Sequence, residues 1–183
     1  MGFKKKSLWG RLGDKIGPNI SKKGSYERYP EKQVTDHEIE KLGFDWFMRD
    51  DIPINLSNGT YILNLDSHKN SGTHWVCFCL QLPEIYYFDP FGTNLNGYPP
   101  NELRLFGKQN GFKNIICFQE DVQHLKSYLC GYYALYMATK FRKHIGNLTP
   151  NKFDNLILKT FTKYPSDKNV NSVTQWSKKV GIL

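Results

Sequence analysis

The chain has 183 residues, of which 39% are hydrophobic and 15% aromatic, and its formal net charge at pH 7 is +8. This length and composition predict a single globular domain with a sizeable core. No run of about 18 apolar residues occurs, which excludes a membrane-spanning helix. The basic N-terminus has no apolar stretch after it, which argues against a secretory signal. The four cysteines are therefore expected to be reduced, intracellular thiols.

Positive charge is concentrated near the N-terminus. Residues 1–24 hold seven basic residues against Asp14 alone, a net charge of 7 − 1 = +6. The basic residues are Lys4, Lys5, Lys6, Arg11, Lys15, Lys22 and Lys23. Glycines in the same segment disfavour a stable helix. We expect residues 1–30 to form a basic, poorly ordered arm, which either binds DNA or another anionic surface or merely adds solubility, and residues 31–183 to form the domain.

A capping box at residues 35–38 predicts the first helix. This helix is expected to run for about twelve residues, until Asp50-Asp51-Ile52-Pro53 ends it, with Ile39, Leu42, Trp46 and Phe47 facing inward. A short strand is predicted over residues 61–65.

Two apolar runs at residues 75–80 and 85–88, separated by four residues, predict a buried antiparallel hairpin. Cys77 and Cys79 share one face of its first strand. No second pair of Cys or His residues stands at zinc-site spacing, which argues against a structural metal.

The second half of the sequence predicts four helices and one strand. A short helix holds Leu103, Leu105 and Phe106, a strand covers 114–118, and a buried helix runs from Cys130 to about Ile145. A further helix begins at Thr149-Pro150 and ends before Pro165, and a second capping box at 172–175 predicts a last, short helix. The order predicts an α+β fold, in which helices pack on a mainly antiparallel sheet and the central buried helix begins at Cys130.

Cys130 is the candidate nucleophile because it stands at the start of that central helix. The first N–H groups of a helix are unpaired and the helix dipole is positive there, which favours a thiolate. The alternative is a cysteine that only packs in the core, since free cysteine is among the most buried residue types.

A nucleophilic cysteine needs an imidazole and a group that orients it. His74 opens the first hairpin strand and Asp89 closes the second, so antiparallel pairing places both at the same edge of the sheet. The alternatives are a structural histidine and an ordinary turn aspartate before proline.

Gln123 lies in the loop that leads to Cys130. Its side-chain N–H and the backbone N–H of Cys130 could together stabilise the oxyanion of a tetrahedral intermediate. Gln119 is the competing candidate, and either glutamine could simply be a solvated loop residue.

Four short motifs occur in one order: Gly72-Thr73-His74-Trp75, Tyr87-Phe88-Asp89-Pro90-Phe91-Gly92, Val122-Gln123 and Cys130-Gly131. Together they resemble the adenain family of adenovirus maturation proteases, which belongs to a larger group with the ubiquitin-like-protein proteases. The resemblance covers residues 35–145. It implies a papain-like cysteine protease fold in which Cys130 is the nucleophile, His74 the general base and acid, Asp89 its orienting carboxylate and Gln123 an oxyanion donor. Adenovirus enzymes usually carry Glu where Asp89 stands, whereas the ubiquitin-like-protein proteases carry Asp.

The resemblance also implies partners. Family members cut viral precursor proteins at glycine-containing sites, and the adenovirus enzyme is activated by DNA and by a viral peptide that forms a disulfide with it. We therefore expect a monomeric endopeptidase that matures capsid precursors of a double-stranded DNA virus, plausibly a virophage, in the virion and at the reducing host-cell site of assembly. The chemistry is expected to need no cofactor, although DNA or a viral peptide could activate the enzyme. Cys117 could form the disulfide with such a peptide, or it could be a buried cysteine of a strand. The alternatives are a protease that removes ubiquitin-like modifiers and an inactive DNA-binding or scaffold protein.

Overall fold

The computed structural model describes residues 32–93 and 98–183. The predicted basic arm, residues 1–30, lies outside the described residues. The same is true of its basic side chains, Lys4, Lys5, Lys6, Arg11, Lys15, Lys22 and Lys23.

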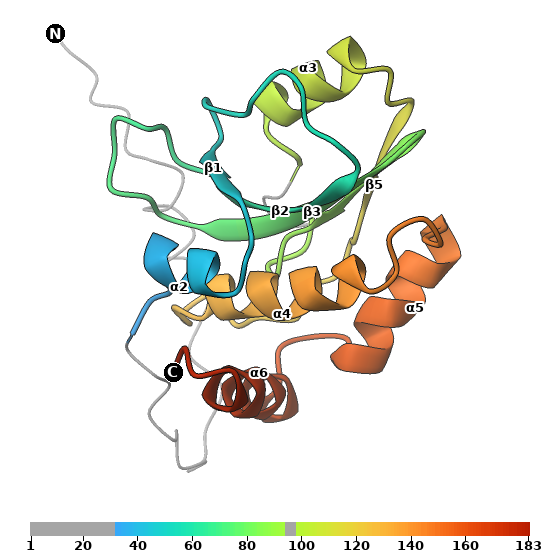
Figure 1. Cartoon of the computed structure of the whole chain (residues 1–183). Coiled ribbons are helices and arrows are strands. Elements are labelled where there is room, and N and C mark those ends of the chain that lie inside the picture. Colours follow the sequence, from blue (N-terminus) through green and yellow to red (C-terminus); the bar gives the residue numbers. More distant parts are fainter. Residues whose placement is uncertain (1–31, 94–97) are drawn as a thin grey trace, which may run out of the picture.

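A five-stranded sheet forms the middle of the molecule (Figure 1). Across the sheet its strands follow chain order: β1 (Trp46–Met48), β2 (Gly59–Asn64), β3 (Trp75–Gln81), β4 (Glu84–Phe88) and β5 (Asn114–Cys117). The pairs β2–β3 and β3–β4 are antiparallel, which confirms the hairpin, but β1–β2 and β4–β5 are parallel. The fold is thus α+β with a mixed sheet, and the expectation of a mainly antiparallel sheet was not exact. Both outer pairs are joined by connections long enough for the chain to return and run parallel.

The first helix is shorter than predicted. Its capping box is present, with the Glu38 carboxylate accepting the Thr35 N–H, but α2 covers only Asp36–Lys41. The chain then turns at Gly43, whose φ of 69° is the left-handed conformation that commonly ends helices. The residues expected at the end of this helix, Trp46 and Phe47, instead form β1 beside β2. The prediction was wrong because it extended a helical pattern across a glycine stop.

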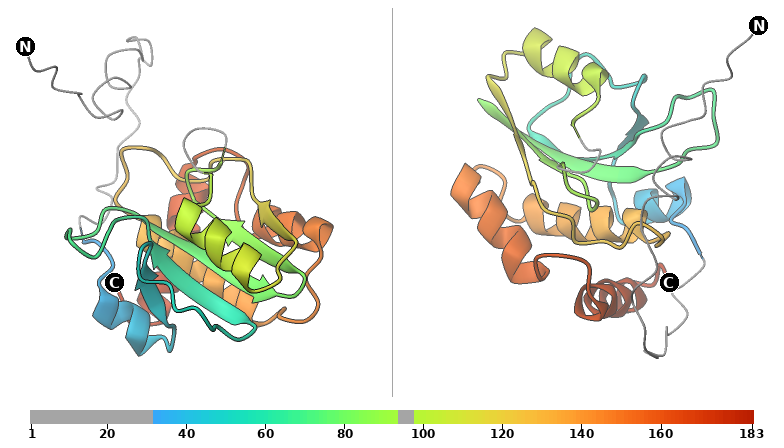
Figure 2. Two further views of the ribbon diagram at one scale, coloured as in Figure 1. Left: turned by 90° about the horizontal axis from the view of Figure 1, so that it is seen from above. Right: turned by 180° about the vertical axis from the view of Figure 1, so that it is seen from behind.

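Helices cover both faces of the sheet because side chains alternate along each strand. Val76, Phe78 and Leu80 of β3 face α3 (Asn101–Gln109), where Leu103 and Phe106 close one core. The intervening Cys77 and Cys79 face the opposite core, which α4 (Cys130–Arg142) fills with buried side chains. The two views of Figure 2 show α3 on one side of the sheet and α4 on the other.

Two further helices pack outside α4, as Figure 1 shows. They are α5 (Pro150–Thr160), which is capped by Thr149 as predicted, and α6 (Asp167–Lys179). The last helix was expected to open at Ser172, but it begins five residues earlier because Ser166 caps it and accepts the N–H of Asn169. Trp176 of α6 stacks on Tyr136 of α4, with ring centroids 5.0 Å apart.

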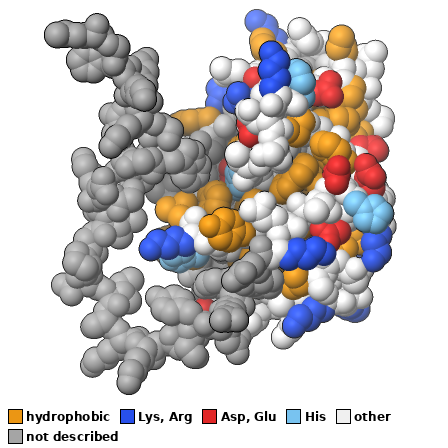
Figure 3. Space-filling model, turned by 90° about the vertical axis from the view of Figure 1, so that its left-hand side faces the viewer, with side chains coloured by type: hydrophobic (Ala, Val, Ile, Leu, Met, Phe, Trp, Pro, Cys, Tyr) orange, Lys and Arg blue, Asp and Glu red, His pale blue; other side chains and the backbone are white. Residues whose placement is uncertain are grey.

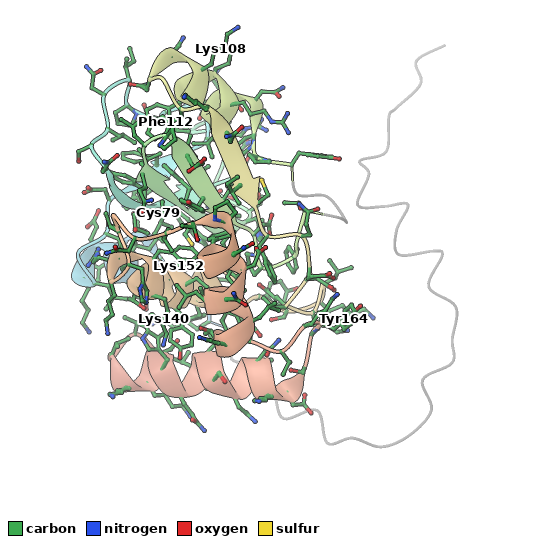
Figure 4. All side chains as sticks on the ribbon, turned by 90° about the vertical axis from the view of Figure 1, so that its right-hand side faces the viewer. Cys79, Lys108, Phe112, Lys140, Lys152 and Tyr164 are labelled. Carbon is green, nitrogen blue, oxygen red and sulfur yellow. The ribbon has the colours of Figure 1, made fainter. Side chains whose placement is uncertain are left out.

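Figure 4 shows the end of the molecule remote from the start of α4. There Cys79 lies inside the sheet, Lys152 lies on α5, and Tyr164 lies in the link between α5 and α6. Within residues 32–93 and 98–183, no helix is long and apolar enough to cross a membrane.

Candidate active site

The structure brings His74 and Asp89 together at one edge of the sheet. His74 directly precedes β3 and Asp89 directly follows β4, and these strands pair antiparallel. The His74 Nε2 atom lies 2.8 Å from Asp89 Oδ1. Both side chains are largely buried, 13% and 4% exposed. The hairpin register therefore brings the carboxylate and the imidazole to the same edge of the sheet.

Cys130 shares this site with His74, since the two residues line the same cleft. Burial, the largest influence, opposes the charged imidazole. The Asp89 carboxylate and the hydrogen bond and charge of Cys130 outweigh it, and they raise the pKa of His74 to about 10. The remaining ring nitrogen, Nδ1, is buried and has no hydrogen-bond partner among the described residues other than Cys130. The imidazole is thus a cation at neutral pH, with Nδ1 left to interact with Cys130.

The turn after β4 assembles much of the site. Asp89 Oδ1 also accepts the N–H of Phe91 at 2.8 Å, and the Phe91 ring stacks on the imidazole with centroids 4.7 Å apart. The Pro90 carbonyl accepts the N–H groups of Val122 and Gln123 at 2.9 and 3.0 Å. These bonds tie the loop that leads to Cys130 onto the turn that holds His74.

Gly92 makes this junction possible. Its φ is 68°, and a Cβ atom on it would lie 2.6 Å from the carbonyl oxygen of Gln119 and 2.7 Å from the backbone nitrogen of Asp121. Only a residue without a side chain permits such a close approach of two backbones. The turn therefore shapes the site in three ways. Asp89 orients the imidazole by its hydrogen bond, Phe91 stacks on the ring, and Gly92 leaves room for the neighbouring loop.

Gln123 is fully buried, and its Nε2 donates to the Ser127 carbonyl at 2.8 Å. The amide thus closes the loop before Cys130, and one of its two N–H bonds is committed there. The competing Gln119 is exposed and its Nε2 donates to Cys117 O at 3.4 Å. Cys130 is the first residue of α4, and the N-cap residue, Leu129, makes no side-chain capping bond.

A cleft of about 1190 Å³ opens beside Cys130. Its apolar wall includes Trp46, Met48, Trp75 and Tyr128. Trp46 meets Trp75 edge to face, with ring centroids 5.8 Å apart. Figure 3 faces this side of the molecule and shows hydrophobic side chains gathered in the middle of the described surface, with charged side chains around them. The rest of the lining is largely polar and includes Asp36, Asp51 and His68.

The other three cysteines differ from Cys130 in their surroundings. All four are unpaired in the structure. Burial raises the pKa of Cys77 well above its usual value. Burial also raises the pKa of Cys79 to about 11, although a hydrogen bond with Thr60 acts in the opposite direction. Burial likewise raises the pKa of Cys117 to about 11, although Arg104 opposes the shift. None of these three lines the cleft. Among the described residues no cluster of three or more His, Cys, Asp or Glu side chains is arranged to hold a metal ion.

The sequence alone gave no role to Phe91, Asn64 or Val34. Phe91 stands inside one of the four motifs, but its stacking on His74 follows only from the folded turn. Asn64 ends β2 and its side chain bonds to both ends of the loop before His74. Val34 packs so closely on Gly131 that a Cβ there would lie 2.5 Å from the Val34 Cβ. In the sequence, the glycine that follows Cys130 is the feature that could have indicated such a close contact.

The sequence matches no protein-family model and no curated protein. Among solved structures, the fold is similar to the crystal structure of the ASFV pS273R protease, with a TM-score of 0.39 and 19% sequence identity. The similarity covers 63% of this chain and 42% of that one, so the chain spans less than half the length of this neighbour. A similarity this low assigns no function, and the functional argument rests on the geometry of the site.

Proposed function

We propose that the chain is a cysteine endopeptidase in which Cys130, His74 and Asp89 form the catalytic triad. The observation that carries the proposal is the 2.8 Å contact between His74 Nε2 and Asp89 Oδ1 beside the cysteine that opens α4. A cationic imidazole and a helix N-terminus both stabilise a thiolate next to them. A nucleophile, its acid–base partner and an orienting group are the requirements of acyl transfer.

The reaction begins when the Cys130 thiolate attacks a peptide carbonyl carbon, and the carbonyl oxygen becomes an oxyanion. His74 Nδ1–H then gives its proton to the amine nitrogen as the C–N bond breaks, which leaves a thioester on Cys130. A water molecule attacks the thioester while His74 Nδ1 takes its proton. The S–C bond breaks, the carboxylic product leaves and the thiolate–imidazolium pair is restored.

The oxyanion is stabilised by a backbone donor at the start of α4 and by a side-chain donor from the loop before it. The backbone N–H of Cys130 is one donor. The N–H bond of Gln123 Nε2 that is not used on Ser127 is the second, as the resemblance to adenain implies. Asp89 holds the imidazole with Nε2 toward itself, so that Nδ1 remains for the proton transfers.

The proposed substrates are capsid precursor proteins of a double-stranded DNA virus such as a virophage, cut in the virion and at the host-cell site of assembly. The four ordered motifs that resemble the adenain family support this assignment. DNA held by the basic arm and a viral peptide are the proposed activators, with no cofactor needed for the chemistry. Burial and the raised pKa of Cys117 make this thiol a poor acceptor for such a peptide.

A second candidate function is the removal of ubiquitin-like modifiers. The observation that favours it is the identity of the orienting acid, because Asp89 matches the ubiquitin-like-protein proteases, whereas adenovirus enzymes usually carry Glu. Both functions use the same triad and differ only in the polypeptide that enters the cleft.

The test is to coexpress the full chain, or its Cys130→Ala variant, with candidate capsid precursors and to sequence the new termini. The proposal expects defined cuts with the wild-type chain and none with the variant. Cleavage of a ubiquitin-like fusion without cleavage of any capsid precursor would instead support the second function. Identical termini from wild type and Cys130→Ala would reject both.

A further inference from the structure

Asn64 is a buried polar residue on the wall of the cleft. It ends β2, is 2% exposed and pairs across the sheet with Trp75, the residue after His74. It lines the same cleft as His74 and Cys130. A buried amide at this place must satisfy both its oxygen and its nitrogen.

The oxygen is fully engaged. Asn64 Oδ1 accepts the N–H of Asp66 at 3.0 Å and the N–H of Thr73 at 3.2 Å, so one atom closes both ends of the loop over residues 65–73. The neighbouring Leu65 N–H donates to the His74 carbonyl at 2.9 Å. These three bonds fix the backbone on both sides of the His74 α-carbon.

The nitrogen is not engaged, since Asn64 Nδ2 donates to no partner among the described residues. The reason it stays uncovered is Gly72, which also lines the cleft. A Cβ on Gly72 would lie 2.7 Å from Nδ2, and the φ of 86° already disfavours any other residue. Because residue 72 is glycine, no side chain at this position covers Asn64 Nδ2 at the wall of the cleft.

Building on the proposed protease function, we propose that Asn64 binds the main chain of the substrate. Its Nδ2 donates a hydrogen bond to a backbone carbonyl oxygen of the polypeptide in the cleft, while its Oδ1 holds the loop in place. In the free chain this donor is open to water at the wall of the cleft, and the substrate carbonyl takes the place of that water. Because the bond contacts the backbone, it adds binding to any sequence that the cleft admits.

The test uses a covalent probe that needs no known cleavage site, acetyl-triglycyl chloromethyl ketone. The Cys130 thiolate displaces its chloride, so an S–C bond forms, a C–Cl bond breaks and chloride leaves. Glycine makes no side-chain demands, so the rate reports on backbone contacts. A set of analogues replaces one inner C=O at a time by CH₂, and iodoacetamide measures the reactivity of the thiol without a peptide.

Asn64→Asp keeps the oxygen that closes the loop and removes the donor. With the wild-type chain, we expect one analogue to react about tenfold or more slowly than the complete ketone. Asn64→Asp is expected to react with the complete ketone more slowly than wild type by the same factor. Its reaction with the analogue that lacks this carbonyl should be no slower than its reaction with the complete ketone. Each rate is divided by the rate of the same chain with iodoacetamide, which removes any effect of the new carboxylate on the reactivity of the thiol. Asn58→Asp, on the exposed turn before β2, is the matched control and should behave as wild type.

Gly72→Ala supplies a second variant should Asn64→Asp fail to fold. It keeps the Asn64 side chain but places a methyl group against Nδ2, so that the amide is covered or displaced, and it should abolish the same discrimination between ketones. Gly146→Ala, also at positive φ but with nothing within 4 Å of its Cβ, controls for backbone strain. If Asn64→Asp or Gly72→Ala still distinguishes the analogues as wild type does, the proposed role of Asn64 is overturned. The proposed protease function would not be affected by that result. A wild-type Cys130 that reacts with neither reagent would overturn the protease function itself.

Discussion

The Oδ1 atom of Asp89 accepts two hydrogen bonds at 2.8 Å, one with His74 Nε2 and one from the backbone N–H of Phe91. The second bond fixes the carboxylate in the turn, so that the first can fix the imidazole. His74 is thereby held on three sides, by the carboxylate, by the stacked Phe91 ring and by the backbone bond from Leu65. A rigid imidazole is what a proton relay to Cys130 requires.

Asp89→Asn tests the charge on this carboxylate. The variant keeps a hydrogen-bonding side chain but removes the negative charge of Asp89. Burial lowers the pKa of His74, and this charge helps to raise it to about 10. We expect the pKa of His74 to fall below about 10, as followed by NMR of the imidazole, and peptide cleavage to fall by about 10²–10⁴-fold. Phe91 should remain stacked, so that unfolding still occurs in one cooperative transition.

The same shift predicts how stability depends on pH. The folded-state pKa of His74, about 10, lies above the unfolded value of 6.5, so the charged imidazole stabilises the fold fully below pH 6.5. This contribution is lost as the pH rises toward 10. The free energy of unfolding should therefore decline over this interval in wild type and decline less in Asp89→Asn. Parallel profiles for the two chains would show that the ion pair does not shift the imidazole.

Gly92→Ala is expected to separate the turn from the loop that carries Gln123. A new Cβ would meet the backbone of residues 119–121 at 2.6 to 2.7 Å. Gly111→Ala is the matched control, because Gly111 has a φ of 78° with nothing within 4 Å. The control should cost about 1–2 kcal/mol from backbone strain, and Gly92→Ala about 1–3 kcal/mol more from overlap. Equal losses in chemical denaturation would mean that the two backbones can separate freely.

Gly131→Ala tests the contact between the start of α4 and the chain before α2. The new methyl group would overlap the Val34 side chain and lie 3.1 Å from Trp75. We expect a loss of about 1–3 kcal/mol in stability and slower alkylation of Cys130. Val34→Gly removes the overlapping atoms, so the double variant should recover part of both losses. Strictly additive effects would show that Val34 is not the obstacle.

The basic arm is expected to bind DNA. Replacing all seven of its basic residues by Gln should weaken binding and flatten its dependence on salt, by about 0.9 in the logarithmic slope for each phosphate that the arm no longer neutralises. The full chain and the variant with all seven replacements would be compared by fluorescence anisotropy on one duplex over a range of salt concentrations. Unchanged affinity and slope would remove the arm from any DNA-dependent activation.

Local signals predicted most of the elements, and the hairpin predicted the site. His74 and Asp89 flank two adjacent strands, so one inference about pairing placed both at the same edge. The start of α4 at Cys130 also followed from sequence, because an apolar helical pattern begins there after a polar loop.

What the sequence could not show depends on contacts between distant segments. The end of α2 at Gly43 could have been read from the sequence, but the strand formed by Trp46–Met48 depends on pairing with β2. β5 runs parallel to β4 because the connection between them, which includes α3, is long enough for the chain to return. Asn64 reads as an ordinary polar residue at the end of a strand, and its role emerges only once Asp66, Gly72 and Thr73 surround it.

The central claim is that His74 activates Cys130, and the alkylation of individual cysteines tests it most directly. The rates for Cys77, Cys79, Cys117 and Cys130 would be measured with iodoacetamide at pH 7 by mass spectrometry, in the folded wild-type chain and in His74→Asn. We predict that Cys130 reacts fastest by at least about tenfold in wild type and that this advantage disappears in His74→Asn. Equal rates for Cys130 and Cys117 in wild type, or a Cys130 rate that does not change in His74→Asn, would contradict the account.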